Sequence, residues 1–290
     1  MAFLKLGIPK GSLEEATIEL FEQAGWSIKK RARNYFPVID DDDIECSLVR
    51  SQEMSRYIED DVLDVGLCGL DWVQENNSDV EVVSDLIYSK VSDKPARWVL
   101  VVEKDSPIQS VKDLDGKRVA TELVGFTKRY LEENGVQADV EFSWGATEAK
   151  VIQGLADAVV EITETGTTIK ANGLRIVEEL MQTHTVLIAN KAALKDPQKK
   201  AKIDQIALML QAALSARHKV LLKMNAPDAN LGEIVAMLPS LHSPTVNPLS
   251  DQNWHAVETV VDRKLTRDLI PALKAAGAQG ILELPLQKIC

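Results

Sequence analysis

The sequence predicts a mixed α/β protein that has a two-lobed core and a smaller C-terminal βαββαβ domain. Short apolar runs alternate with helical patterns along the first part of the chain, a second series of the same kind begins at Arg118, and the rhythm changes after residue 216. A chain of 290 residues also exceeds the usual size of one hydrophobic core, so we expect two or three domains.

The first lobe opens with a strand over Phe3–Ile8 and a turn that leads into a helix with its apolar residues on one side. Ser12 is a candidate cap for this helix, with Glu15 three residues later as in a capping box. The next predicted elements are a strand over Ile44–Val49, a helix over Ser51–Glu59 and a strand that begins in Val62–Gly66. Such alternation indicates a largely parallel sheet.

The second lobe is predicted from a further strand and helix series. Its strands are expected over Trp98–Val102, Arg118–Thr121, Val140–Phe142 and Ala156–Ile162, and its helices over Phe126–Asn134 and Glu148–Gln153. A strand over Val186–Ala189 and a long helix over Pro197–Leu222 then suggest a return to the first lobe. We therefore expect a periplasmic-binding-protein-like core with a cleft between lobe I (residues 1–98, completed by 186–216) and lobe II (residues 99–185).

Residues 217–290 change to a ferredoxin-like order of elements. The predicted elements are a strand or helix end over Lys219–Met224, a helix over Leu231–Met237, strands over Thr245–Pro248 and Trp254–Val261, a helix over Leu265–Ala276 and a strand over Gly280–Pro285. This β-α-β-β-α-β order is compact enough to form a separate small domain.

The composition excludes several classes of protein. A formal net charge of -11 disfavours binding to nucleic acid or to anionic lipid, and no apolar run approaches the length of a membrane span. Three widely spaced cysteines and the lack of a signal-peptide core predict a cytoplasmic protein without disulfides. The four histidines have no metal-ligand spacing, so no metal ligand is named and any metal is expected to arrive with a substrate.

The segment from Glu161 to Thr168 carries the most chemical information. A strand ends in acids and leads through Thr165, Gly166, Thr167 and Thr168 into a helical pattern. Amides and hydroxyls in such a loop can bind a phosphate, and Glu161 and Glu164 can accept hydrogen bonds from ribose hydroxyls. The same residues also suit an ordinary helix cap, and composition alone leaves both interpretations open.

The chain resembles the long form of the ATP phosphoribosyltransferase family over essentially its whole length. The strongest match runs from Gly154-Leu155-Ala156-Asp157-Ala158 through Thr165-Gly166-Thr167-Thr168 to Ala171-Asn172-Gly173-Leu174. Other matches, in the same order, are Ile8-Pro9-Lys10-Gly11, Asp64-Val65-Gly66-Leu67-Cys68-Gly69, Arg118-Val119-Ala120-Thr121-Glu122, Gly145-Ala146-Thr147-Glu148 and Ser243-Pro244-Thr245-Val246-Asn247-Pro248-Leu249.

The resemblance implies that ATP reacts with 5-phosphoribosyl 1-diphosphate in the first step of histidine biosynthesis, with Mg²⁺ accompanying the diphosphate. It assigns catalytic roles to Lys10, Arg50 and Glu161, and substrate contacts to Gly11, Arg33, Glu148, Glu164, Thr165, Gly166, Thr167 and Thr168. No protein nucleophile is required, because the adenine N1 attacks while the protein positions both substrates and stabilises charge. The chain departs from the family at Glu161, where Asp is usual, and at Ser12, where Arg is usual.

The resemblance also implies an ACT-like regulatory domain at residues 217–290 that binds histidine as a feedback inhibitor in a homohexamer. Ser243 and Thr245 lie in the matching segment and are candidate effector contacts. A turn around Pro244 is the alternative explanation for both residues, and it suits Ser243 better than Thr245. One alternative is a non-catalytic two-lobed sensor of amino acids or nucleotides, which would not need a phosphate loop beside ribose-facing acids. Another is an orotate- or adenine-type phosphoribosyltransferase, which is expected to have adjacent acids and no regulatory tail.

Overall fold

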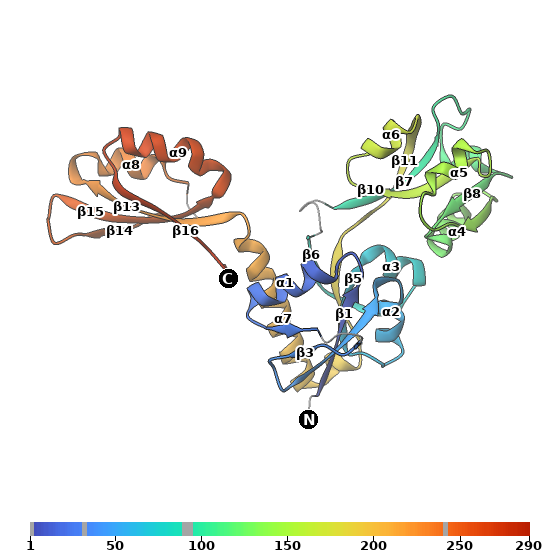
Figure 1. Cartoon of the computed structure of the whole chain (residues 1–290), viewed down its shortest axis with the longest axis horizontal. Coiled ribbons are helices and arrows are strands. Elements are labelled where there is room, and N and C mark those ends of the chain that lie inside the picture. Colours follow the sequence, from blue (N-terminus) through green and yellow to red (C-terminus); the bar gives the residue numbers. More distant parts are fainter. Residues whose placement is uncertain (1–2, 31–33, 89–94, 240–242) are drawn as a thin grey trace. The chain divides into compact units, whose positions relative to one another are not determined.

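The computed structural model describes residues 3–30, 34–88, 95–239 and 243–290 (Figure 1). The chain forms two compact units, of which the second contains Leu208–Cys290 together with Gln23–Gly25. The first unit holds two five-stranded sheets, and we call each sheet with its helices the first and the second lobe. Within the described residues, no helix is both long enough and apolar enough to cross a membrane.

The sheet of the first lobe has four strands that run in one direction and one that is reversed. Its spatial order is β4 (Ile44–Arg50), β1 (Leu4–Lys10), β5 (Val65–Gly69), β12 (Thr185–Ala189) and β6 (Glu81–Leu86), and β12 is the reversed strand. The helices of this lobe are α1 (Glu14–Ala24), α2 (Ser51–Glu59) and α3 (Leu70–Asn76). Because β1, β4 and β5 are parallel, their carboxyl ends meet at one edge of the sheet.

The sheet of the second lobe repeats this arrangement. Its spatial order is β11 (Leu174–Thr183), β7 (Ala96–Glu103), β10 (Ala158–Thr163), β8 (Arg118–Thr121) and β9 (Asp139–Phe142), and β7 is the reversed strand. Its helices are α4 (Val124–Glu133), α5 (Glu148–Ile152) and α6 (Thr167–Ala171), and a 3₁₀ turn, η1, covers Val111–Leu114. Buried aliphatic side chains form one core on each face of this sheet. The chain enters this lobe through β7 and leaves it through β11, after which β12 joins the sheet of the first lobe.

The second unit is the predicted βαββαβ domain. A four-stranded antiparallel sheet has the order β14 (Thr245–Pro248), β15 (Trp254–Asp262), β13 (Lys219–Pro227) and β16 (Gln279–Pro285). Helices α8 (Leu231–Met237) and α9 (Arg263–Ala275) lie on the same face of it, as Figure 1 shows, and a 3₁₀ turn, η3 (Asp228–Asn230), precedes α8. Val220, Leu222 and Met224 alternate along β13 and are buried in the core beneath these helices.

The structure corrects some of the predicted elements. Helix α7 (Pro197–Ala216), which follows a 3₁₀ turn at Ala193–Lys195, ends before Leu222 because the alternating residues after Lys219 belong to β13. At the start of α1, the amide of Gly11 donates to the carboxylate of Glu14, so Glu14 rather than Glu15 makes the capping hydrogen bond. The sequence analysis did not predict the short antiparallel pair β2 (Ile28–Lys29) and β3 (Val38–Ile39), or the ten-residue strand β11.

Candidate active site

Two of the predicted basic residues lie side by side at the carboxyl edge of the first sheet. Lys10 is the last residue of β1 and Arg50 the last of β4, and the two are register partners in the parallel pair. Gly11 follows with a φ of 119°, and a Cβ at this position would lie 3.3 Å from Nη1 of Arg50. The Lys10 ammonium also lies 4.1 Å from the ring centroid of Tyr35. Strand pairing therefore brings two cations together, and a glycine leaves space beside them.

These cations line a cavity of about 410 Å³ between the two lobes of the first unit. The first lobe contributes Lys10, Gly11, Ser12, Arg50 and Gln52 to its wall, and the second lobe contributes Ile162 and Glu164, from the end of β10 and the loop after it, and Trp144. The volume falls within the range of about 300–1,000 Å³ that is usual for small-molecule sites. The cavity thus has Lys10 and Arg50, together with the buried Asp71, on the side of the first lobe and Glu164 on the side of the second.

The threonine-rich loop connects β10 to α6 and is held together by its own hydroxyls. Gly166 has a φ of 74°, and its amide donates to the hydroxyl of Thr163 at 2.8 Å. The hydroxyls of Thr165 and Thr167 are 2.9 Å apart, and the amide of Thr167 donates to Thr165 at 3.4 Å. These contacts order the loop itself, whereas α6 has Gly166 as its N-cap residue and no side-chain cap hydrogen bond. A phosphate bound here would accept hydrogen bonds from the amides of Gly166 and Thr167, which now donate to threonine hydroxyls.

Glu161 lies two residues before Thr163, the last residue of β10, and is half-buried. Burial, together with the charges of Glu148 and Glu122, raises the pKa of its carboxyl group to about 7, although hydrogen bonds from Ile162 and Thr147 act in the opposite direction. Glu148 begins α5, and burial also raises the pKa of Glu122. The second lobe therefore holds an acid that changes charge close to neutral pH.

Direct hydrogen bonds connect the two lobes at the cavity walls, where Asp71 lines the first cavity. Asp71, which is 4% exposed, accepts a hydrogen bond from the indole of Trp98 at 2.9 Å, and burial raises the pKa of its carboxyl group. The carboxylate of Glu75 in α3 accepts hydrogen bonds from the amides of Gly125 and Phe126 at 2.8 and 2.7 Å. Both amides belong to the first turn of α4. Neither pair was predicted from the sequence, because the partners are far apart along the chain.

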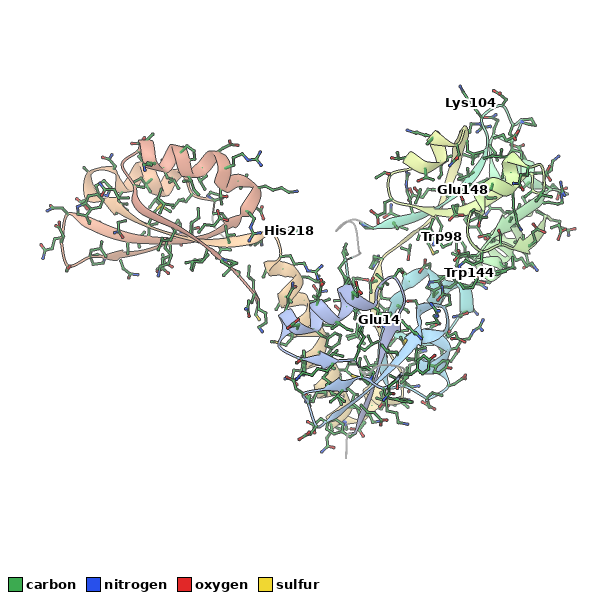
Figure 2. All side chains as sticks on the ribbon, viewed as in Figure 1. Glu14, Trp98, Lys104, Trp144, Glu148 and His218 are labelled. Atoms are coloured by element: carbon green, nitrogen blue, oxygen red, sulfur yellow. The ribbon has the colours of Figure 1, made fainter. Side chains whose placement is uncertain are left out.

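A second cavity of about 340 Å³ adjoins the first and has an aromatic lining. Its wall includes Trp72, Phe142 and Trp144, and Figure 2 shows Trp144 on the second lobe. The two cavities share the residues Arg50, Gln52, Trp72 and Trp144. The sequence analysis missed these aromatic residues. The one available signal was a tryptophan immediately before Gly145, in the loop that leads to Glu148.

Of the predicted site residues, Lys10, Gly11, Arg50 and Glu164 line the first cavity, and Arg50 also lines the second. Neither cavity is lined by the other predicted residues of the second lobe, which are Glu148, Glu161, Thr165, Gly166, Thr167 and Thr168. Arg33 lies outside the described residues. Ser243 and Thr245 are exposed in the second unit, where Thr245 begins β14 and pairs with Glu258 of β15. The roles assigned to individual site residues therefore stay predictions.

Comparisons with known proteins agree over the whole chain. The family profile described as ATP phosphoribosyltransferase matches residues 50–212, and the profile described as HisG, C-terminal domain matches residues 216–288. A protein from Desulfosudis oleivorans named ATP phosphoribosyltransferase is 62% identical over 286 residues, which cover 99% of this chain and 98% of that protein. A protein of the same name from Nitratidesulfovibrio vulgaris is 60% identical over 286 residues, with the same coverage.

A solved structure supports the same relationship. It is titled as the ATP phosphoribosyl transferase (HisG:HisZ) complex from Thermotoga maritima and matches with a TM-score of 0.62 and 29% sequence identity. The match covers 72% of this chain and 99% of the chain in that structure.

Proposed function

Because the chain belongs to the ATP phosphoribosyltransferase family, we propose that it joins ATP and 5-phosphoribosyl 1-diphosphate to form 1-(5-phosphoribosyl)-ATP and diphosphate, the first step of histidine biosynthesis. The observation that carries this proposal is the arrangement of charge around the first cavity. Lys10 and Arg50 lie on one wall of it, and Glu164 lies on the opposite wall.

This arrangement suits the charge that develops in the reaction. Negative charge grows on the departing diphosphate, and positive charge grows on the ribosyl ring as its C1–O bond breaks. Lys10 and Arg50 would stabilise the diphosphate, and the guanidinium group of Arg50 can bind two of its oxygens at once. The carboxylate of Glu164 on the opposite wall would face the ring, so the two walls would stabilise opposite charges in the transition state.

The loop from Glu161 to Thr168 would hold the ribosyl 5-phosphate and the ribose hydroxyls. Gly166, with its positive φ, allows the backbone to approach the phosphate, and Thr165, Thr167 and Thr168 supply hydroxyls. The ionised form of Glu161 would accept hydrogen bonds from ribose hydroxyls. Glu148, near Glu161, would contact the nucleotide or support that carboxyl group.

Magnesium would enter this site on the phosphate oxygens of the substrates. In the parts of the chain that the structure describes, no group of three or more His, Cys, Asp or Glu side chains could hold a metal ion. Mg²⁺ keeps several waters and commonly binds substrate phosphates together with one or two carboxylates. When bound, the ion would neutralise part of the charge on the diphosphate.

We assign a regulatory role to residues 217–290. An ACT-like domain that binds histidine, with Ser243 and Thr245 among the contacts, would let the end product of the pathway inhibit its first step. Inhibition requires that histidine bind the inactive state more tightly than the active one. We also propose that the chain forms a homo-oligomer, from a dimer up to a hexamer. We further propose that it acts in the cytoplasm.

The test is an assay of product formation by the full chain with ATP, 5-phosphoribosyl 1-diphosphate and Mg²⁺. The product is identified by mass spectrometry, and omission of each substrate in turn is the control. We expect turnover with both substrates that falls when histidine is added. Absence of product from a folded chain would overturn the transferase proposal, and turnover that histidine leaves unchanged would overturn only the regulatory one.

A further inference from the structure

The second cavity contains two large aromatic side chains that are exposed to solvent. Trp144 is 73% exposed and Phe142 is 61% exposed, whereas Trp26 and Trp98 are 7% and 2% exposed. An indole ring that is left in water at the wall of a cavity offers a large planar surface for a ligand. The alternative is that this surface is covered by another protein chain.

The backbone on both sides of Trp144 is anchored. The amide of Ser143 donates to the carbonyl oxygen of Thr121 at 2.9 Å, and Ser143 is 4% exposed. The amide of Gly145, which has a φ of 71°, donates a hydrogen bond to the carboxylate of Glu122. The exposed indole therefore projects from an ordered segment, and a ligand that stacks on it would lose little binding energy to ordering the loop.

The polar groups of this cavity favour a base over a phosphate. Glu75 and Glu122 line it together with Asn76, and carboxylate and amide oxygens can accept hydrogen bonds from the exocyclic amine of a purine. The same carboxylates would repel a polyphosphate at that end. Arg50, shared with the first cavity, and Arg56 supply positive charge toward which a triphosphate can run.

The two cavities also adjoin where the reaction requires them to meet. A nitrogen of the adenine ring must reach C1 of the ribosyl group, so the base and the ribosyl donor must lie next to each other. Trp72 and Trp144 line both cavities. A base that stacks on Trp144 in the second cavity would have an edge directed at a donor in the first.

We propose that Trp144, supported by Phe142, is the platform on which the adenine ring of ATP stacks in this enzyme. This inference rests on the proposed function for the identity of the nucleotide. It assigns the second cavity to the base of ATP and the first to the phosphoribosyl donor. Stacking supplies affinity and orientation, because every base has a planar face, and the polar groups of the cavity distinguish adenine.

The experiment compares the full-length wild type with Trp144→Ala and Trp144→Phe. ATP affinity is measured by calorimetry without the donor, and KM is measured for each substrate. Replacement of a stacking aromatic by alanine costs about 1–3 kcal/mol per base, which corresponds to an ATP affinity about 5- to 140-fold weaker. We expect Trp144→Phe to lose less ATP affinity than Trp144→Ala. In both variants the KM for the donor should stay within about twofold of the wild-type value.

A second readout uses the exposure of the indole. ATP should protect one tryptophan of the wild type from quenching by acrylamide, and this protection should be missing in Trp144→Phe. Trp254→Phe, which removes a half-buried tryptophan of the second unit, is the matched control and should keep the protection.

The outcomes separate this inference from the proposed function. If the wild type forms no product but ATP still protects Trp144, the platform is supported and the transferase proposal fails. If product forms while Trp144→Ala leaves ATP affinity unchanged, the platform is overturned. The platform is also overturned if Trp144→Ala weakens the binding of both substrates alike and lowers the melting temperature. It is overturned as well if the substitution alters only the oligomeric state, which would identify Trp144 as a subunit contact.

Discussion

The raised pKa of Glu161 predicts a pH dependence that can be calculated. With a pKa of about 7, the carboxyl group is about 9% ionised at pH 6 and about 91% ionised at pH 8. If the carboxylate must accept hydrogen bonds from the ribose, kcat/KM for 5-phosphoribosyl 1-diphosphate should rise about tenfold between these two pH values. The Glu161→Gln variant cannot ionise and should be slow throughout this range.

The assay measures kcat/KM for the donor from pH 5.5 to 9 at saturating ATP and Mg²⁺. Phosphate groups of the substrate titrate near pH 6, so the informative quantity is the ratio of wild type to Glu161→Gln, in which that titration cancels. Glu122→Gln removes one nearby negative charge and should move the midpoint of the ratio to lower pH. A ratio that stays flat between pH 6 and 8 would refute the reasoning.

Stability should change with pH in the opposite direction to activity. The pKa of Glu161 in the folded protein is above its ordinary value of 4.5, so the folded state binds the proton more tightly than the unfolded state does. The resulting stabilisation is complete below about pH 4.5 and is lost as the pH rises through about 7. The melting temperature of Glu161→Gln, compared with that of the wild type, should therefore increase from pH 5 to pH 8.

Three further predictions concern the lobes and the cleft. In Gly125→Ala the new Cβ would lie 2.8 Å from the carbonyl oxygen of Glu75, so the contact between α3 and α4 must shift. The free energy of unfolding, measured by denaturant titration, should fall by about 1–3 kcal/mol. An unchanged midpoint would contradict this prediction. Arg50→Ala should lower kcat roughly 10- to 100-fold while the stability changes by less than about 0.5 kcal/mol, because the side chain is exposed; unaltered kinetics would remove Arg50 from the site. Of the three thiols, only the exposed Cys290 should react quickly with a thiol reagent in the native protein, and a stoichiometry above one would show that a buried cysteine is accessible.

The sequence predicted best those elements whose apolar pattern is regular. The helix over Ser51–Glu59 has the expected bounds because a single face of it contacts the core, and the strand over Arg118–Thr121 has the expected bounds because its short apolar run is buried on both faces. Strand β11 was missed because its residues, Leu174–Thr183, are mostly half-buried along both faces and it has two register shifts against β7. Neither irregularity produces the alternation on which the prediction depended.

The same contrast applies to the candidate site. The cations at the carboxyl ends of β1 and β4 could be predicted, since an apolar run that ends in Lys10 or Arg50 marks a strand end, and parallel strands bring such ends together. The hydrogen bond between Trp98 and Asp71 could not be predicted, because it joins a residue of α3 to a strand of the other lobe and depends on how the lobes pack. The hydroxyl contacts inside the threonine loop were equally hidden, since composition does not say which oxygen an amide meets.

The packing of the lobes also explains why the aromatic cavity is preserved. The carboxylate of Glu75 caps the first turn of α4 from the other lobe, and Glu75 and Val124, the first residue of α4, both line that cavity. Gly125 allows this approach, because any larger side chain would contact the α3 backbone. The contact that joins the lobes therefore also forms part of the wall of the cavity that Trp144 lines. A change that loosens it should weaken ATP binding before it weakens binding at the threonine loop, whose hydrogen bonds lie within the second lobe alone.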